Sequence, residues 1–412
     1  MEFTINAEYL KGKVDLLKGI TKVKSLMPVT RNVLMTLAGQ GGTIRATDLE
    51  VSAITELRSE YDGPEPKQIM VNGGVLSGIL EGFAKKDVNI TQPEEDKGTL
   101  VIRYNKTEIG LAMQNPEDFP EVKALDGDVA LSVPGVDIMR GINKVLYAVS
   151  ADESRYTLTG ILIEIKGGQF RMCATDGFRV ALYKKDIRDG ATPTPQILVP
   201  GRNIKMLKET IDDKDDVDVV IDAKHAQFMT PVVTLIFRTI EGAFPDYESL
   251  IPSNHDHMIF IRRVALLDSL KHVAPLTKKD DNVVFLNRDF SGGLTISVET
   301  SAGYAVDTID CEYKSQAPFQ QAFNLKFILD AIEHMDADQI SITYPEGFGA
   351  AVFEEPGYTC LVMPIRGMET PIIARKTRIP DTSLASPGED RAESTEKKLK
   401  FHKTNKGNKA DE

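Results

Sequence analysis

The residues that could perform acid–base or metal chemistry do not form a familiar catalytic set. Residues 254–257, with the sequence Asn-His-Asp-His, contain the only histidine cluster. Because no third ligand stands at helical spacing, we expect an interdomain linker here rather than a metal site. Asp48 and Asp176 each follow Ala-Thr at the end of a predicted strand, where a carboxylate usually accepts hydrogen bonds from a turn. The sequence therefore indicates no catalytic residue, no bound metal and no cofactor.

The cysteines and glycines also lack the spacing of a reactive or ligand-binding motif. Cys173, Cys311 and Cys360 stand far apart and form no CxxC pair, so we expect reduced thiols buried in strands. The glycine pairs at 73–74 and 292–293 have no phosphate-loop context. An enzyme of this length without a recognisable site would be unusual.

Basic residues are concentrated on a few predicted helices. Residues 9–25 carry five lysines against a single aspartate, although the whole chain has a net charge of −12. A solvated polar face explains one such helix, but repetition of the bias on equivalent helices favours a local basic surface. Residues 324–337 are an exception because they are net acidic. The basic candidates are Lys11, Lys13, Lys18, Lys22, Lys24, Arg140, Lys144, Arg202, Lys205, Lys208 and Lys271.

The basic helices belong to an internal repeat. Residues 16–23, 138–145 and 266–273 share apolar positions at i, i+1, i+4 and i+7, the stripe of an amphipathic helix. A second apolar-periodic segment recurs at 71–83, 199–211 and 323–335, and each copy precedes a short alternation typical of a strand. The repeat predicts that each unit contains two helices and many short strands.

The spacing of the repeats predicts three similar α+β domains, at residues 1–125, 126–252 and 253–367. The remaining residues, 368–412, contain ten basic and eight acidic residues and no sustained apolar period. Such a segment cannot bury enough surface to offset its ordering entropy. We therefore expect a disordered, charged tail.

The overall composition is that of a globular protein, with 42% hydrophobic and 27% charged residues. No apolar run approaches the roughly 20 residues that a membrane helix needs. The first ten residues have neither a basic n-region nor an apolar h-region. We expect a cytoplasmic protein with no membrane contact.

Several segments, in this order, resemble the bacterial sliding clamps, the β subunits of DNA polymerase III. They are SLMPVTRNVLM, ATDLEVSA, DFPEV, SRYTLTGILIE, CATDGFRVAL, LVPGRNIKMLKE, GAFPDYESLIP and YTCLVMPIR. The resemblance implies three domains, each with two helices and two antiparallel sheets. It also implies a head-to-tail homodimer that closes as a ring around duplex DNA, with the basic candidates facing the DNA, and that serves as a polymerase processivity factor.

The same resemblance implies a pocket between the middle and last domains for peptides of the replicative polymerase, the clamp loader and repair proteins. Two positions depart from the family pattern: Phe178 replaces a usual His, and Ser249 a common Arg. Both changes make the rim less polar. The implied pocket residues are Arg155, Leu158, Thr175, Gly177, Phe178, Arg179, Val180, Pro245, Ser249, Leu250, Leu361, Val362, Met363, Pro364, Ile365 and Arg366.

Two other classes of function compete with a ring-shaped clamp. One is a replication accessory protein that binds its partners without encircling DNA. The other is an enzyme on a repeated α+β scaffold, for which the sequence offers neither a nucleophile with a base nor a cofactor loop.

Overall fold

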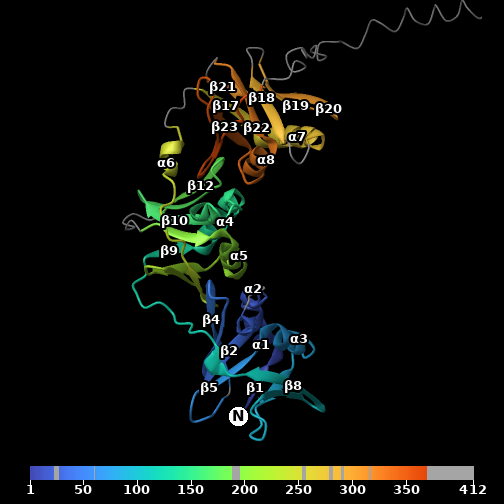
Figure 1. The fold of residues 1–412 in the computed structure, drawn as a ribbon, viewed down its shortest axis with the longest axis vertical. Coiled ribbons are helices and arrows are strands. Elements are labelled where there is room, and N and C mark those ends of the chain that lie inside the picture. Colours follow the sequence, from blue (N-terminus) through green and yellow to red (C-terminus); the bar gives the residue numbers. More distant parts are fainter. Residues whose placement is uncertain are drawn as a thin grey trace, which may run out of the picture. The chain divides into compact units, whose positions relative to one another are not determined.

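The computed structural model describes residues 1–22, 27–59, 61–187, 195–252, 257–277, 282–288, 292–314 and 317–368. This part of the chain forms three successive α+β repeats (Figure 1). Each repeat has two main helices and two sets of four antiparallel strands, which confirms the predicted fold class.

The first repeat shows the pattern that the other two follow. Its strands run in the orders β1-β6-β7-β8 and β5-β2-β3-β4. Its strands are β1 (Glu2–Asn6), β2 (Asn32–Ala38), β3 (Gly41–Thr47), β4 (Val51–Arg58), β5 (Lys67–Asn72), β6 (Asp87–Thr91), β7 (Thr99–Tyr104) and β8 (Thr107–Gln114). Its helices are α1 (Ala7–Leu16), α2 (Lys18–Thr21) and α3 (Gly73–Glu81). The side chains of Asn6 and Asn72 accept N–H bonds in the first turns of α1 and α3, as helix caps do.

The second repeat has the equivalent strand orders β9-β14-β15-β16 and β13-β10-β11-β12. The strands are β9 (Leu131–Pro134), β10 (Gly160–Lys166), β11 (Gln169–Thr175), β12 (Arg179–Asp186), β13 (Ile197–Pro200), β14 (Asp216–Ile221), β15 (His225–Met229) and β16 (Thr234–Arg238). The helices are α4 (Gly135–Val145), α5 (Gly201–Thr210) and the short α6 (Tyr247–Leu250).

The third repeat again has two matching sets, β17-β23-β24-β25 and β22-β18-β19-β20, with β21 (Glu312–Tyr313) added beside β17. The other strands are β17 (Met258–Arg262), β18 (Val283–Arg288), β19 (Leu294–Thr300), β20 (Gly303–Ile309), β22 (Phe319–Asn324), β23 (Gln339–Thr343), β24 (Ala351–Glu355) and β25 (Tyr358–Val362). The helices are α7 (Arg263–Val273) and α8 (Leu325–Glu333).

Neighbouring repeats are joined through their sheet edges. β4 of the first repeat pairs with β16 of the second, and β12 of the second pairs with β25 of the third. We call these the first and the second junction. In each repeat order β4, β12 and β20 occupy the same place, and so do β8, β16 and β25. Within the described residues, β20 and the Thr107–Ala112 part of β8 therefore remain as edges of the same two kinds.

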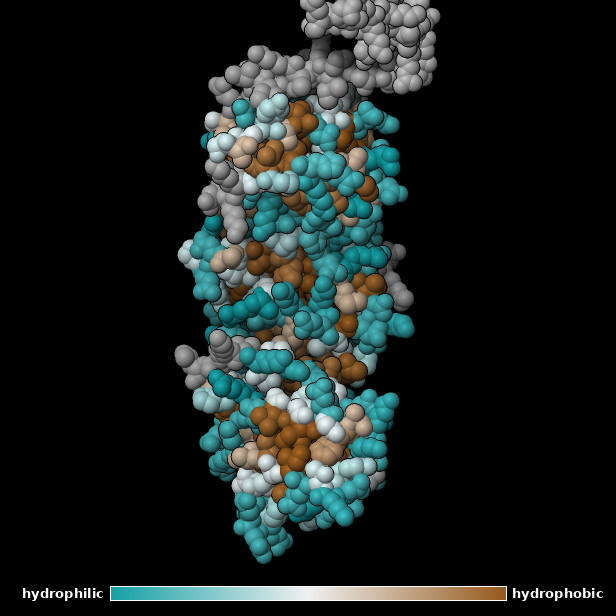
Figure 2. All heavy atoms as spheres, turned by 90° about the vertical axis from the view of Figure 1, so that its right-hand side faces the viewer, coloured by the Kyte–Doolittle hydropathy of each residue, from teal (hydrophilic) through white to brown (hydrophobic). Residues whose placement is uncertain are grey.

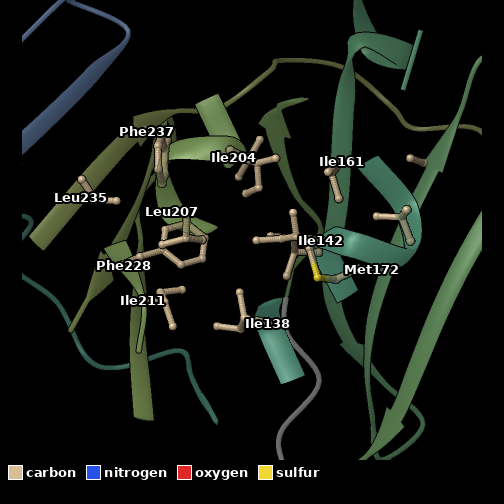
Figure 3. Packing of buried hydrophobic residues seen from close by; sticks show 14 of the residues in the cluster. Ile138, Ile142, Ile161, Met172, Ile204, Leu207, Ile211, Phe228, Leu235 and Phe237 are labelled. Carbon is tan, nitrogen blue, oxygen red and sulfur yellow. The ribbon is translucent and has the colours of Figure 1, made fainter. Parts of the chain in front are cut away.

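Each repeat buries its core between its helices and strands. In the second repeat, Ile138 and Ile142 of α4 face Ile204 and Leu207 of α5, with strand residues such as Phe228 around them (Figure 3). These helix positions are the ones that the 3.6-residue periodicity assigns to a buried stripe. The main helices of the three repeats lie toward the right-hand side in Figure 1.

Most helix positions agree with the sequence-based expectations. The segment 9–25 is an exception, because its helix is interrupted at Leu17 between α1 and α2. Cys173 and Cys360 are buried in β11 and β25 as predicted, whereas Cys311 is half-buried; all three are free thiols. In the described ranges, no helix combines the length and apolarity needed to cross a membrane. Residues 254–256 of the predicted linker and all of 369–412 lie outside the description.

Candidate functional site

The turn between β11 and β12 presents an aromatic side chain to solvent. Asp176 Oδ1 accepts the N–H groups of Phe178 and Arg179 at 3.0 and 3.1 Å, and Thr175 Oγ1 accepts that of Gly177 at 3.1 Å. Gly177 has φ +87°, which glycine adopts without strain. This arrangement confirms the turn role predicted for Asp176 and leaves Phe178 53% exposed.

Three neighbours surround Phe178. The guanidinium of Arg155 lies 5.6 Å from the ring centre and donates to the Asp176 carbonyl at 3.0 Å. The Phe327 ring of α8 stacks on Phe178 with the centroids 6.4 Å apart. Met363, which is 42% exposed, donates its N–H to the Phe178 carbonyl at 2.9 Å. The result is an exposed apolar surface with one cation beside it, at the end of the second junction.

The helix α6 brings further apolar groups from the segment after β16. Tyr247 is buried, and its hydroxyl donates to Glu164 Oε1 at 2.6 Å; burial and this carboxylate raise the pKa of Tyr247. Tyr247 packs in one cluster with Val180 and Leu361. This anchor leaves Leu250, at the end of α6, exposed.

The predicted pocket residues divide into a surface layer and a supporting layer. The exposed members are Arg155, Gly177, Phe178, Pro245, Ser249, Leu250, Met363 and Arg366. The buried or half-buried members are Leu158, Thr175, Arg179, Val180, Leu361, Val362, Pro364 and Ile365. The surface layer is therefore the part that a partner reaches most directly. The role of this site in peptide binding stays a prediction.

Sequence reasoning missed two aromatic residues at this site. Phe327 contacts Phe178, and Phe348 is exposed with the Arg366 guanidinium 5.5 Å from its ring. A signal for Phe327 was present in the sequence, since it is an aromatic residue directly beside Ile328 of the buried stripe of α8. Phe348 lies in a loop, where periodicity gives no information.

Arg179 supports the site from behind. Its guanidinium bonds Asp176 at 3.0 Å, Asp330 of α8 at 2.6 Å and the Tyr147 carbonyl at 2.7 Å. The Phe327 ring centre lies 4.4 Å from the same guanidinium. Arg179 is buried, so its charge is used to hold the second junction together.

The position of Lys144 contradicts a sequence-based expectation. It was expected to face DNA, but it is only 4% exposed. Its ammonium group contacts Glu355 at 2.5 Å, Asp336 at 2.9 Å and the His334 carbonyl at 2.5 Å. All three partners belong to the third repeat, far along the chain, which is why helical periodicity could not reveal them. Lys144 is therefore a buried ion-pair residue of the second junction.

A phenol and thiol cluster completes this junction. The hydroxyls of Tyr147 and Tyr358 are 2.5 Å apart, and the Tyr147 hydroxyl contacts Cys360 Sγ at 3.2 Å. Burial raises the pKa of Cys360 to about 11 and that of both tyrosines well above the usual range. The cluster is thus neutral at ordinary pH and shows no activated nucleophile. Nowhere in the described chain do three His, Cys, Asp or Glu side chains gather as a metal site.

The other basic candidates differ in exposure. Lys11, Lys13 and Lys18 are half-buried; Lys11 and Lys18 contact Asp15 at 2.7 and 3.6 Å. Lys271 is exposed and contacts Glu333 at 3.1 Å. Lys24 lies outside the described residues. The remaining candidates are exposed: Lys22, Arg140, Arg202, Lys205 and Lys208.

Comparison with known families accounts for the three repeats. Models of the N-terminal, central and C-terminal domains of the DNA polymerase III beta subunit match residues 1–123, 132–246 and 248–366 in turn. The chain belongs to the DNA polymerase III beta subunit family. This family consists of non-catalytic processivity factors, which disfavours an enzyme on a repeated scaffold.

Relatives of the beta subunit family match nearly the whole described chain. The beta sliding clamp of Pseudomonas aeruginosa is 27% identical over 371 residues, covering 89% of this chain and all of the relative. That of Caulobacter vibrioides is 25% identical with the same coverage. The crystal structure of the DNA polymerase III subunit beta from Pseudomonas aeruginosa has 26% identity and a TM-score of 0.82 over 89% of this chain and all of that one. A Bacillus subtilis sliding clamp, at 22% identity and a TM-score of 0.82, shares the fold.

Proposed function

We propose that this beta subunit family member is a polymerase processivity factor that works as a head-to-tail homodimeric ring around duplex DNA. Family membership supports the processivity role. The observation that supports a ring is that the same kind of edge pairing joins neighbouring repeats at both junctions. Two of the three equivalent edge pairs are joined within the chain, and the third pair, β20 and β8, is left for a second copy.

The geometry of the two existing junctions supports this third one. At the first junction Arg238 donates its N–H to the Glu50 carbonyl at 2.9 Å, and at the second Met363 donates to Phe178 at 2.9 Å. The same type of backbone hydrogen bond thus occurs at both junctions. A head-to-tail contact between β20 of one protomer and β8 of its partner repeats it in each direction, so two chains make a closed assembly in which every edge of these two kinds is paired.

We further propose that the surface layer around Phe178 binds peptide segments of partner proteins. The replicative polymerase, the clamp loader and other proteins with a similar binding motif are the expected partners. Exposed Phe178, Leu250 and Met363 provide apolar contacts, and thioether and aromatic groups adapt to related ligands. In the proposal the domains span residues 1–125, 126–252 and 253–367, with 368–412 as a dispensable tail, in the bacterial cytoplasm.

The test compares retention on a closed DNA circle and on the same circle cut once, at high salt, after loading by a cognate clamp loader. A ring is held by topology and should stay on the closed circle while it is lost from the cut one. The protein should also have a native mass of twice 45.5 kDa. Equal loss from both DNAs would favour a non-encircling accessory protein.

A further inference from the structure

The helix α5 of the middle repeat stands out from its equivalents in the other repeats by its exposed charge. We infer that duplex DNA is held mainly by the phosphate contacts of α5, through Arg202, Lys205 and Lys208, rather than evenly by the helices of all three repeats. This inference rests on the proposed function, in which DNA lies along the helix-bearing side. That side is largely hydrophilic but has several apolar areas (Figure 2).

The three helices α3, α5 and α8 occupy the same place in the repeat but expose different surfaces. The exposed residues of α3 include Gly74, Val75 and Gly78, and the helix contains no cation. The helix α8 exposes Lys326 and Glu333 and also carries Asp330, so it is net acidic. Only α5 combines three exposed cations with one exposed acid, Glu209. Of these three helices, α5 therefore attracts a polyanion most strongly.

Several basic side chains of other helices are already engaged, and the exposed cation of α4 is the single Arg140. Lys11 and Lys18 share Asp15, Lys271 contacts Glu333, and Lys144 is buried. By contrast, no carboxylate lies within ion-pair distance of Arg202, Lys205 or Lys208 in the described structure. A lysine that leaves a carboxylate to bind a phosphate exchanges one ion pair for another. An unpaired, hydrated cation gains the contact and releases counterions, so α5 contributes more to DNA binding.

The α5 cations lie on neighbouring turns of the helix. Their i, i+3 and i+6 spacing spreads them over about 9 Å of helix axis. A cavity of about 460 Å³ lined by Lys22, Gly19 and Met206 places α2 beside α5. A Cβ on Gly19 would lie 2.9 Å from the Met206 methyl group, so this glycine permits the close approach.

The test uses the full-length protein and a short fluorescein-labelled duplex, with binding followed by anisotropy between about 25 and 200 mM salt. The slope of log K against log salt is negative. The variant Arg202→Gln/Lys205→Gln/Lys208→Gln should make it shallower by about 2.7, since each lost phosphate contact contributes about 0.9. Its affinity should fall at least about tenfold at the lowest salt. Glutamine keeps the helix propensity and all three sites are exposed, so the fold and the dimer mass should be unchanged.

The matched control is Lys11→Gln/Lys18→Gln/Lys271→Gln, which removes the same net charge from helices whose lysines are paired. The slope of log K against log salt should become shallower by less than 1 in this control. Equal changes in the two variants, or no change in the α5 variant, would overturn the inference. Retention on closed and cut circles separates this result from the proposed function. If the wild type distinguishes the circles but the α5 variant binds short duplex normally, only the inference about α5 fails.

Discussion

The two junctions share a backbone design but differ in their side chains. Both join an edge strand of one repeat to an edge strand of the next, and both end with the same N–H to carbonyl bond. At the first junction that bond joins Glu50 and Arg238, whose side chains form an ion pair at 4.0 Å on the surface. At the second it joins Phe178 and Met363, two exposed apolar residues.

The difference extends into the interior. The first junction has a hydroxyl contact in which Thr55 donates to the Val232 carbonyl at 2.8 Å and accepts from Lys13 at 3.3 Å. The second has the buried ion pairs of Lys144 and Arg179. The strand pairing thus sets the position of the repeats, while side chains decide which junction is polar at its surface and which one exposes apolar groups.

The largest expected effect comes from breaking a buried ion pair of the second junction. Lys144→Ala leaves the Glu355 carboxylate, whose side chain is 4% exposed, without its cation. Removal of one partner of such a pair typically costs about 3–5 kcal/mol. Urea denaturation followed by circular dichroism should show a clear fall in the free energy of unfolding. The matched change at the first junction, Arg238→Ala, should cost less than about 1 kcal/mol because its ion pair is exposed. Similar losses in both would mean that the two ion pairs do not differ in their contribution to stability.

The next effect concerns partner binding. Phe178→Ala/Met363→Ala removes exposed apolar area at the second junction, and it should weaken binding of a polymerase-derived peptide by about 2 kcal/mol, or about 30-fold. Calorimetric titration measures the affinity. The equivalent pair, Glu50→Ala/Arg238→Ala, should leave peptide affinity unchanged. A loss of affinity in the control alone would place the peptide site at the first junction.

The smallest effect tests the matching turns that precede β4 and β12. Asp48 Oδ1 accepts the N–H groups of Glu50 and Val51, as Asp176 does in its own turn, but the left-handed position is Leu49, with φ +80° and 51% exposure. Leu49→Gly should stabilise the protein by about 0.5–1 kcal/mol, since strain of a side chain at positive φ outweighs the flexibility of glycine.

Gly177→Ala is the reciprocal change at the second turn. It should destabilise the protein by about 1–2 kcal/mol, because a Cβ there would also lie 2.7 Å from Arg155 Nη1. Thermal melts of the two variants should move in opposite directions. Movement in the same direction would show that the turns are not equivalent.

The sequence allowed the repeated helices and the turn role of Asp48 and Asp176 to be predicted, because both depend on local patterns. It misplaced Lys144, since its partners Glu355 and Asp336 are about two hundred residues away. It also could not separate exposed Met363 from buried Leu361, although both stand in one short motif. Burial and pairing at a junction depend on which strands meet, and periodicity within one segment does not contain that information.

The junction ladder also has a mechanical consequence. Five residue pairs of β12 and β25 lie abreast, so the second and third repeats are held together by a row of main-chain hydrogen bonds that run across the strands. The surface around Phe178 and Met363 is attached to the end of this ladder through a backbone bond. In the proposed function, a partner that pulls on that surface therefore transmits force to the main chain of both repeats rather than to a single flexible side chain.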